Sequence, residues 1–268
     1  PLVEALLRRL KLLLLTSAAG ALSIHYLVLT PLQAQTSPQA IQQQAQLQRQ
    51  ILRWAVACAF GLLWVGVGLL AWQLWLTQEQ SASPSSWLAQ SWYLLIGTFW
   101  GNLWIVRQCV LLFFGSGLWF LSRKRQDTIA PSLHLLIAGR AVDLLIVQAV
   151  SSHQIGGTSN WLLMLLSVTA HLLAASIWMG SILVMALWVV PAILRRQQKM
   201  AIPGWQPIRW SRFTLLAASS VGLLFASGLY SIGKQVASPD ALFTTDYGWL
   251  LLGKLLLVLL AGLCGLGN

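Results

Sequence analysis

Histidine and methionine side chains are the groups of this chain that could bind a metal ion. His153 lies in the polar, glycine-containing segment SSHQIGGTSN, and His171 opens the apolar segment HLLAASIWMG. Counting one bilayer core back from Pro191 places His171 at the outer membrane surface, beside the loop that carries His153. Two imidazoles at a membrane surface suit a late first-row metal such as copper. We therefore expect a copper site at His153 and His171, with a further ligand from elsewhere.

A second set of soft ligands lies deeper in the apolar segments. His25 precedes Pro31 by six residues, which places it about 9 Å from the inner end of its helix. Met185 occupies the corresponding position in an internal repeat, so imidazole and thioether would lie at matching depth. These are ligands that a path for Cu(I) would use, with side-chain packing as the alternative. A spacing of seven residues favours one helix face for Met164, His171, Trp178 and Met185.

Four charged residues fall inside apolar segments. Arg107 and Lys254 are expected about 9 Å inside the outer surface, where they either snorkel outward or hold an anionic partner. That partner would be Asp143 or a cofactor carboxylate. Arg140 and Asp143 are three residues apart, so they are expected to pair on one helix face.

The composition excludes an ordinary soluble domain. Hydrophobic residues make up 57% of the chain and charged residues 9%, with a mean hydropathy of +0.71. The net charge of +11 does not indicate nucleic acid, because the cations lie in short loops between apolar segments. There they orient the chain and would meet anionic lipids at the cytoplasmic face. The three cysteines have no CxxC spacing, and no catalytic motif occurs, so we expect no disulfide or zinc site and no enzyme.

The apolar segments predict an all-α, polytopic transmembrane bundle that forms a single membrane domain over residues 1–268. The cations place residues 49–53, 123–125 and 195–212 in the cytoplasm. A polar Gln-rich loop is expected at 34–50, and a short interfacial helix before residue 99. Because the chain begins at Pro1 and ends inside an apolar segment, we expect further sequence at both ends. The seven predicted spans are 10–30, 51–76, 101–121, 132–150, 162–191, 209–231 and 248–268.

An internal repeat accounts for the odd number of spans. Gly20 and Pro31 are eleven residues apart, as are Gly180 and Pro191. TFWGNLWIVR likewise matches TDYGWLLLGK in the spacing of threonine, glycine and the final cation. We therefore predict a parallel repeat of three helices, at 10–121 and 162–268, joined by the connecting helix 132–150.

The second half of the chain resembles the CopD family of bacterial copper-resistance membrane proteins. The segments that carry the resemblance are HLLAASIWMG, RFTLLAASSVGLLFASGLY and TTDYGWLLLGKLLLVLLAGLCGLGN. The resemblance implies a protein of the bacterial inner membrane or an internal membrane that moves copper, beside an extracytoplasmic copper-binding partner. The residues that match the family pattern are His171, Tyr247, Gly248, Lys254 and Asn268.

Two other functions stay open at this point. A b-type haem protein would use two of His25, His134 and His171 as axial ligands, and its helical superfamily includes haem-binding relatives. An accessory subunit of a larger membrane complex would explain the fifteen tryptophans and the small extramembrane part.

Overall fold

The computed structural model forms two compact units, residues 1–224 and 225–268, and each is described by itself. Side chains are not described at 131–135, 138, 195–197, 234, 235, 241 and 242. The residues that the structure describes are 2–29, 31, 34, 35, 37–79, 86–123, 131–151, 160–197, 206–235, 241–246, 248–250, 252, 253, 255–257 and 260.

The described residues are helical apart from short connections and one isolated bridge between Leu29 and Ile208. Helix α8 (Trp210–Gln235) begins in the first unit and ends in the second, which also holds α9 (Ala241–Thr244) and the apolar stretch Gly248–Leu257. The first unit holds α1 (Leu2–Ser23), the π-helix η1 (Ile24–Val28), α2 (Pro38–Glu79), α3 (Trp87–Gly97), α4 (Phe99–Arg123), α5 (Pro131–Val150), α6 (Trp161–Val184), the π-helix η4 (Met185–Val189) and α7 (Val190–Gln197).

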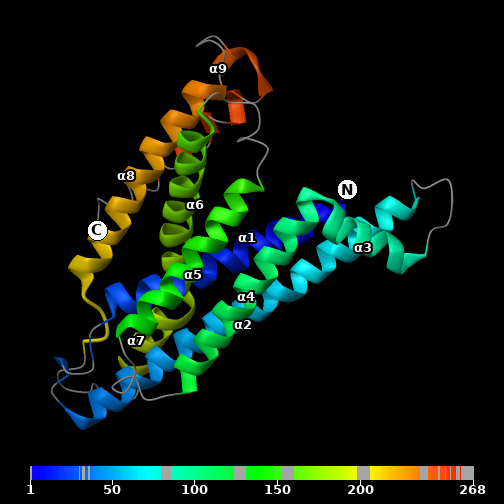
Figure 1. Cartoon of the computed structure of the whole chain (residues 1–268). Coiled ribbons are helices and arrows are strands. Elements are labelled where there is room, and N and C mark those ends of the chain that lie inside the picture. Colours follow the sequence, from blue (N-terminus) through cyan, green and yellow to red (C-terminus); the bar gives the residue numbers. More distant parts are fainter. Residues whose placement is uncertain are drawn as a thin grey trace. The chain divides into compact units, whose positions relative to one another are not determined.

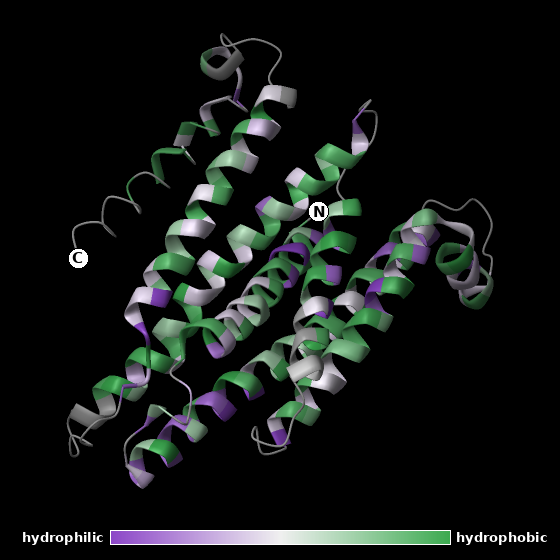
Figure 2. Cartoon of the chain, turned by 60° about the vertical axis from the view of Figure 1, so that its left-hand side comes forward, coloured by the Kyte–Doolittle hydropathy of each residue, from purple (hydrophilic) through white to green (hydrophobic). Residues whose placement is uncertain are grey.

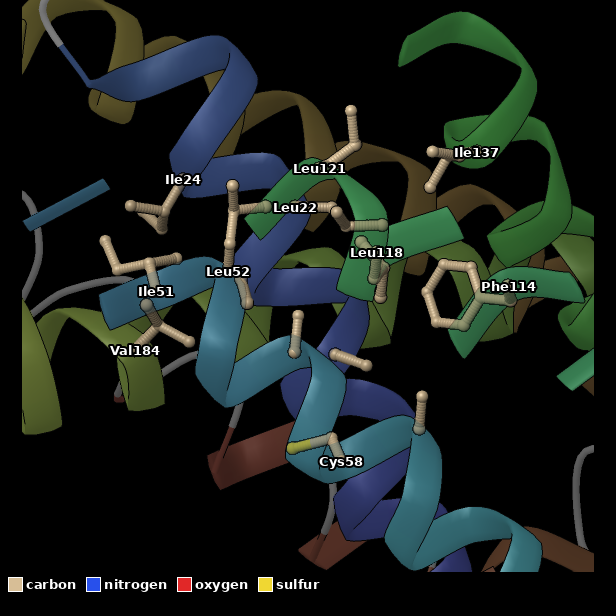
Figure 3. Close-up of a cluster of buried hydrophobic side chains, with 14 of the residues drawn as sticks. Leu22, Ile24, Ile51, Leu52, Cys58, Phe114, Leu118, Leu121, Ile137 and Val184 are labelled. Carbon is tan, nitrogen blue, oxygen red and sulfur yellow. The ribbon is translucent and has the colours of Figure 1, made fainter. Parts of the chain in front are cut away.

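Five long helices of the first unit pack in a closed ring (Figure 1). Helix α1 contacts α2, α2 contacts α4, α4 contacts α5, α5 contacts α6, and α6 returns to α1, while α3 packs on α4. The ring encloses one apolar core, part of which is drawn in Figure 3. Its fully buried side chains include Ile24, Ile51, Leu52, Phe114, Leu118, Leu121, Ile137 and Val184.

The outward faces of these helices are apolar as well, as Figure 2 shows. The side chain of Trp64 on α2 is 74% exposed and that of Phe113 on α4 is 73% exposed. Water would not tolerate so many exposed large hydrophobic groups, whereas lipid does. Five helical segments are long and apolar enough to cross a membrane, namely Leu2–Val28, Pro38–Glu79, Phe99–Arg123, Trp161–Leu194 and Trp210–Gly233.

These five segments cover five of the seven predicted spans. The prediction for 132–150 coincides with the helix α5, which is not among the five, and part of its side chains lies outside the described residues. Most of the last predicted span, 248–268, is also outside them. Seven spans and the three-helix repeat therefore stay predictions, and so does the interfacial position of α3, whose helix itself is confirmed.

The Gln-rich loop predicted at 34–50 is wrong, because α2 already begins at Pro38. Glutamine is a good helix former, and here the Gln44 side chain also has a tertiary partner. Gln44 is fully buried, and its Nε2 donates to the carbonyl oxygen of Pro207 at 3.3 Å. At 42 residues, α2 is about 63 Å long, well beyond a bilayer core of about 30 Å, so its glutamine end extends out of the apolar zone.

The segment before α8 is tied to the end of the first helix. The amide of Arg209 donates to the carbonyl oxygen of Val28 at 3.0 Å, and Gln35 Nε2 donates to that of Gln206, also at 3.0 Å. The first of these bonds satisfies the carbonyl group of Val28 at the helix end, where the helix itself offers no partner.

Candidate functional site

The candidate site is built around the crossing of α1 and α6. A side-chain carbon added at Gly20 would overlap the backbone of Gly180, and one added at Gly180 would overlap the carbonyl oxygen of Thr16. Only glycine permits this approach. Small residues are how helices reach close contact in lipid, where apolar contact alone gives no reward.

Each of the two helices widens into a π-turn after the crossing. In η1 the amide of Leu29 donates to the carbonyl oxygen of Ile24 at 2.9 Å. In η4 the amide of Val190 donates to the carbonyl oxygen of Met185. Both bonds span five residues instead of four, a rare geometry that occurs frequently at functional sites.

A proline follows each π-helix. Pro191 lies two residues after η4 inside the continuing helix, where it offers no N–H to Leu187 and crowds that carbonyl group. A wider turn before the proline moves the carbonyl group aside. In the first helix Leu29 is already extended, with ψ of 142°, and Pro31 lies two residues beyond it.

The two predicted soft ligands lie in these π-helices. His25 is the second residue of η1 and is 7% exposed, and Met185 is the first residue of η4 and is 6% exposed. The imidazole of His25 meets the ring of Tyr26 edge-on, with 4.7 Å between centroids. Ile24 and Val184, next to the two ligands in the chain, belong to the same apolar cluster with residues of α2 (Figure 3).

Polar groups accompany this cluster. The indole Nε1 of Trp54 on α2 donates to Ser17 Oγ of α1 at 2.7 Å, and the Trp54 ring lies 5.8 Å from that of Trp188 in η4. Trp188 Nε1 and Ser181 Oγ are buried and have no hydrogen-bond partner among the described residues. Buried polar groups normally have a partner, so each of these two groups can form a hydrogen bond with a water molecule or a polar ligand.

The described residues contain no group of three or more His, Cys, Asp or Glu side chains that could hold a metal ion. A permanent site of several hard or nitrogen ligands is therefore not formed by this part of the chain. Cu(I) differs from these cases, because it accepts few, soft ligands such as methionine thioethers.

The predicted outer copper site involves a residue outside the described part of the chain. His153 is not described, so its approach to His171 stays a prediction. His171 is half-buried in α6, ten residues after Trp161, and lies about 15 Å from the start of the helix. The loop would have to fold back along α6 to reach it. Of His134 only the backbone, in the first turn of α5, is described.

The structure describes three of the four charged residues inside the apolar segments. Arg140 Nη1 lies 3.0 Å from Asp143 Oδ2, so these two form the expected ion pair on α5. Arg107 is half-buried in α4 and forms no ion pair with the described carboxylates. Lys11 of α1 lies near enough for the two like charges to repel each other. Lys254 lies outside the described residues, so an anion held with Arg107 stays a prediction.

Two polar features of the first unit were not anticipated from the sequence. The bond between Trp54 and Ser17 joins residues far apart in the chain, and neither has a local signal that singles it out. A cavity lined by arginines between α2 and α4 had a partial signal, because Arg49 and Arg53 are four residues apart and so share a helix face.

Long apolar helices, lipid-like outer faces and buried polar groups at a helix crossing define a polytopic membrane protein. The family model of copper resistance protein D (CopD) matches residues 207–268 and supports membership of the CopD family. The resemblance seen in the sequence is thereby confirmed for the last quarter of the chain. No curated protein and no solved structure matches the chain. His25, His171 and Met185 lie outside the matched residues.

Proposed function

We propose that this protein moves copper, as Cu(I), across a bacterial inner membrane or an internal membrane, without catalysing a covalent change. The observation that carries the proposal is the burial of His25 and Met185 in two π-helices beside a glycine crossing. The match of residues 207–268 to CopD supports copper as the cargo.

The chemistry of the two side chains suits this cargo. The thioether is a soft ligand that suits Cu(I), and imidazole also binds copper, so Met185 and His25 would each contact the ion along its path. Burying a histidine in a membrane helix costs free energy, and such residues mark ion and substrate pathways. The buried hydroxyl of Ser181 would supply a further oxygen contact near η4 for the ion or its water.

Copper would enter the path at the outer face of the membrane. We place His153 and His171 there as the first copper ligands, with a periplasmic copper-binding protein as the donor. At the opposite face the cations would contact anionic lipids. Arg107 and Lys254, inside the apolar segments, would hold an anionic group on the bundle side.

The parallel repeat is part of this proposal. Gly20 and Gly180 contact each other, and each is followed by a π-helix and then by a proline. The π-helices depart from this spacing by one residue, because η1 begins four residues after Gly20 and η4 begins five residues after Gly180. This correspondence supports two copies of a three-helix unit, with seven spans in total and the crossing at their pseudo-symmetry axis.

The test compares a buried methionine, Met185, with an exposed one, Met179, in the same apolar segment Trp161–Leu194. Met185→Leu removes the thioether with little change of volume, and Met179→Leu, at a side chain that is 54% exposed on α6, is the matched control. Copper uptake into proteoliposomes under reducing conditions should fall at least tenfold for Met185→Leu and for His25→Ala. It should stay at the wild-type level for Met179→Leu.

The outcomes separate the proposed function from its rivals. If Met185→Leu and His25→Ala both transport copper normally, the path is wrong. A Soret absorption band in the purified protein that disappears in His25→Ala would assign haem b instead. Co-purification with fixed membrane subunits, and no copper uptake by the isolated chain, would indicate an accessory subunit.

A further inference from the structure

A cavity of about 480 Å³ lies between α2 and α4. It is lined by Arg49, Arg53, Val56, Trp119, Ser122 and Arg123. Three of its six lining residues are arginines, and none is acidic. Neither of the two ion pairs found among the described residues involves these arginines. The exposed side chains of Arg49, Arg53 and Arg123 place three like charges around one cavity, and an anion between them would offset their mutual repulsion.

The arginines are arranged to face a common ligand. Arg49 and Arg53 lie one turn apart on α2, so their side chains project from the same face. Arg123 ends α4, and its guanidinium carbon lies 4.1 Å from the centroid of the Trp119 ring. This stacking holds the Arg123 side chain in place while its N–H groups stay available. Guanidinium groups bind phosphate oxygens in pairs, which favours a phosphate over a simple halide.

The surroundings of the cavity favour a phosphate that is attached to lipid. The face of α2 that carries Arg49 and Arg53 continues along the helix with Val56, Phe60 and Trp64. The side chains of Phe60 and Trp64 are 46% and 74% exposed. This apolar track runs along a helix that is long and apolar enough to span a membrane. A free phosphate would use the arginines alone, whereas a phospholipid would also lay an acyl chain along the track.

We infer that the cavity between α2 and α4 binds the headgroup of one anionic phospholipid, with Arg49, Arg53 and Arg123 on its phosphate. Cations at this end of α2 and α4 mark the cytoplasmic side, where anionic lipids are concentrated. Basic pockets between membrane helices on that side recognise such headgroups. The site shares no residue with the proposed copper path, whose described ligands lie in η1, α6 and η4.

Native mass spectrometry of the detergent-purified protein with phosphatidylglycerol or phosphatidylcholine tests this site. Wild-type protein should retain one phosphatidylglycerol in preference to phosphatidylcholine. Arg49→Gln/Arg53→Gln should weaken that retention about twenty-five-fold, from about fivefold for each arginine. Arg209→Gln/Arg212→Gln removes two cations of the same predicted side that do not line the cavity, and it should retain the lipid as wild type does.

Three results would overturn the inference. Unchanged retention by both Arg49→Gln/Arg53→Gln and Arg123→Gln would remove the arginines from the site. Equal losses in the Arg209→Gln/Arg212→Gln control would indicate a diffuse charge effect. Thermal stabilisation by inorganic phosphate equal to that by phosphatidylglycerol would assign a soluble anion. Arg123→Gln, at the end of a helix, keeps the test valid if the double variant fails to fold.

Discussion

Gly20 of α1 and Gly180 of α6 are in backbone contact, with the Cα of Gly20 2.9 Å from the place that a side-chain carbon of Gly180 would occupy. No side chain separates the two helices at this point. The crossing therefore determines how the helices that carry His25 and Met185 approach each other.

We predict that Gly180→Ala destabilises the protein by about 1–3 kcal/mol, because the added carbon forces the two backbones apart. The better helix propensity of alanine, about 1 kcal/mol, offsets part of this cost. Gly222→Ala is the control, since a carbon at this exposed glycine of α8 would meet no described atom within 4 Å. Thermal unfolding in detergent measures both, and equal melting temperatures of the two variants would refute the close crossing.

The sequence predicted the fold class and five of the membrane-crossing helices well, because long apolar segments have one stable form in lipid. It marked Gly20 and Gly180 as equivalent but could not show that they touch. In a membrane helix both the packed face and the lipid face are apolar, so periodicity does not distinguish them. The helical start of α2 was missed because Gln44 finds its partner, Pro207, only through the tertiary fold.

The candidate site was predictable only in part, for the same physical reason. His25 and Met185 could be named from residue type and depth. Their π-helices could not, because a hydrogen bond shifted by one residue leaves no clear trace in composition. The contact of Trp54 with Ser17 likewise depends on how α1 and α2 pack.

We predict that Ser17→Ala destabilises the protein by about 1 kcal/mol, typical of hydrogen bonds between membrane helices. The change removes the acceptor of the Trp54 indole N–H, whose bond is 2.7 Å long. Ser219→Ala on α8 is the control, because the exposed Ser219 hydroxyl bonds only within its own helix. In a Trp54→Phe background, Ser17→Ala should cost much less, and an undiminished cost there would show that the hydrogen bond is not the cause.

The length of α2 allows a direct test of how the chain is oriented in the membrane. Gln46 and Glu79 are 33 residues apart on one helix and thus about 50 Å apart, more than the full thickness of about 40–45 Å of a bilayer with its headgroups. With the native cysteines replaced by alanine, we expect an impermeant maleimide on intact spheroplasts to label Glu79→Cys and not Gln46→Cys. Membrane permeabilisation should expose Gln46→Cys as well. Labelling of Gln46→Cys alone in intact spheroplasts would reverse the assigned orientation.

The energy of the ion pair on α5 depends on whether that helix lies in water or in lipid. Arg140 and Asp143 lie 3.0 Å apart, with side chains 43% and 37% exposed in the absence of lipid. If water fills this face, the pair contributes at most about 1 kcal/mol, as exposed pairs do. If the face lies in the apolar part of a membrane, as the predicted span 132–150 requires, an unpaired arginine costs about 2.5–3.5 kcal/mol.

We therefore predict that Asp143→Asn destabilises the protein by about 2–3 kcal/mol, while Arg140→Gln/Asp143→Asn recovers most of that loss because no lone charge remains. Chemical unfolding of the four proteins of this double-mutant cycle gives the coupling energy of the pair. Breaking the exposed pair of Arg8 and Glu4 on α1 with Glu4→Gln is the control, and we expect a cost below about 0.5 kcal/mol. A coupling between Arg140 and Asp143 as small as that control would place α5 in water and remove it from the membrane-spanning helices.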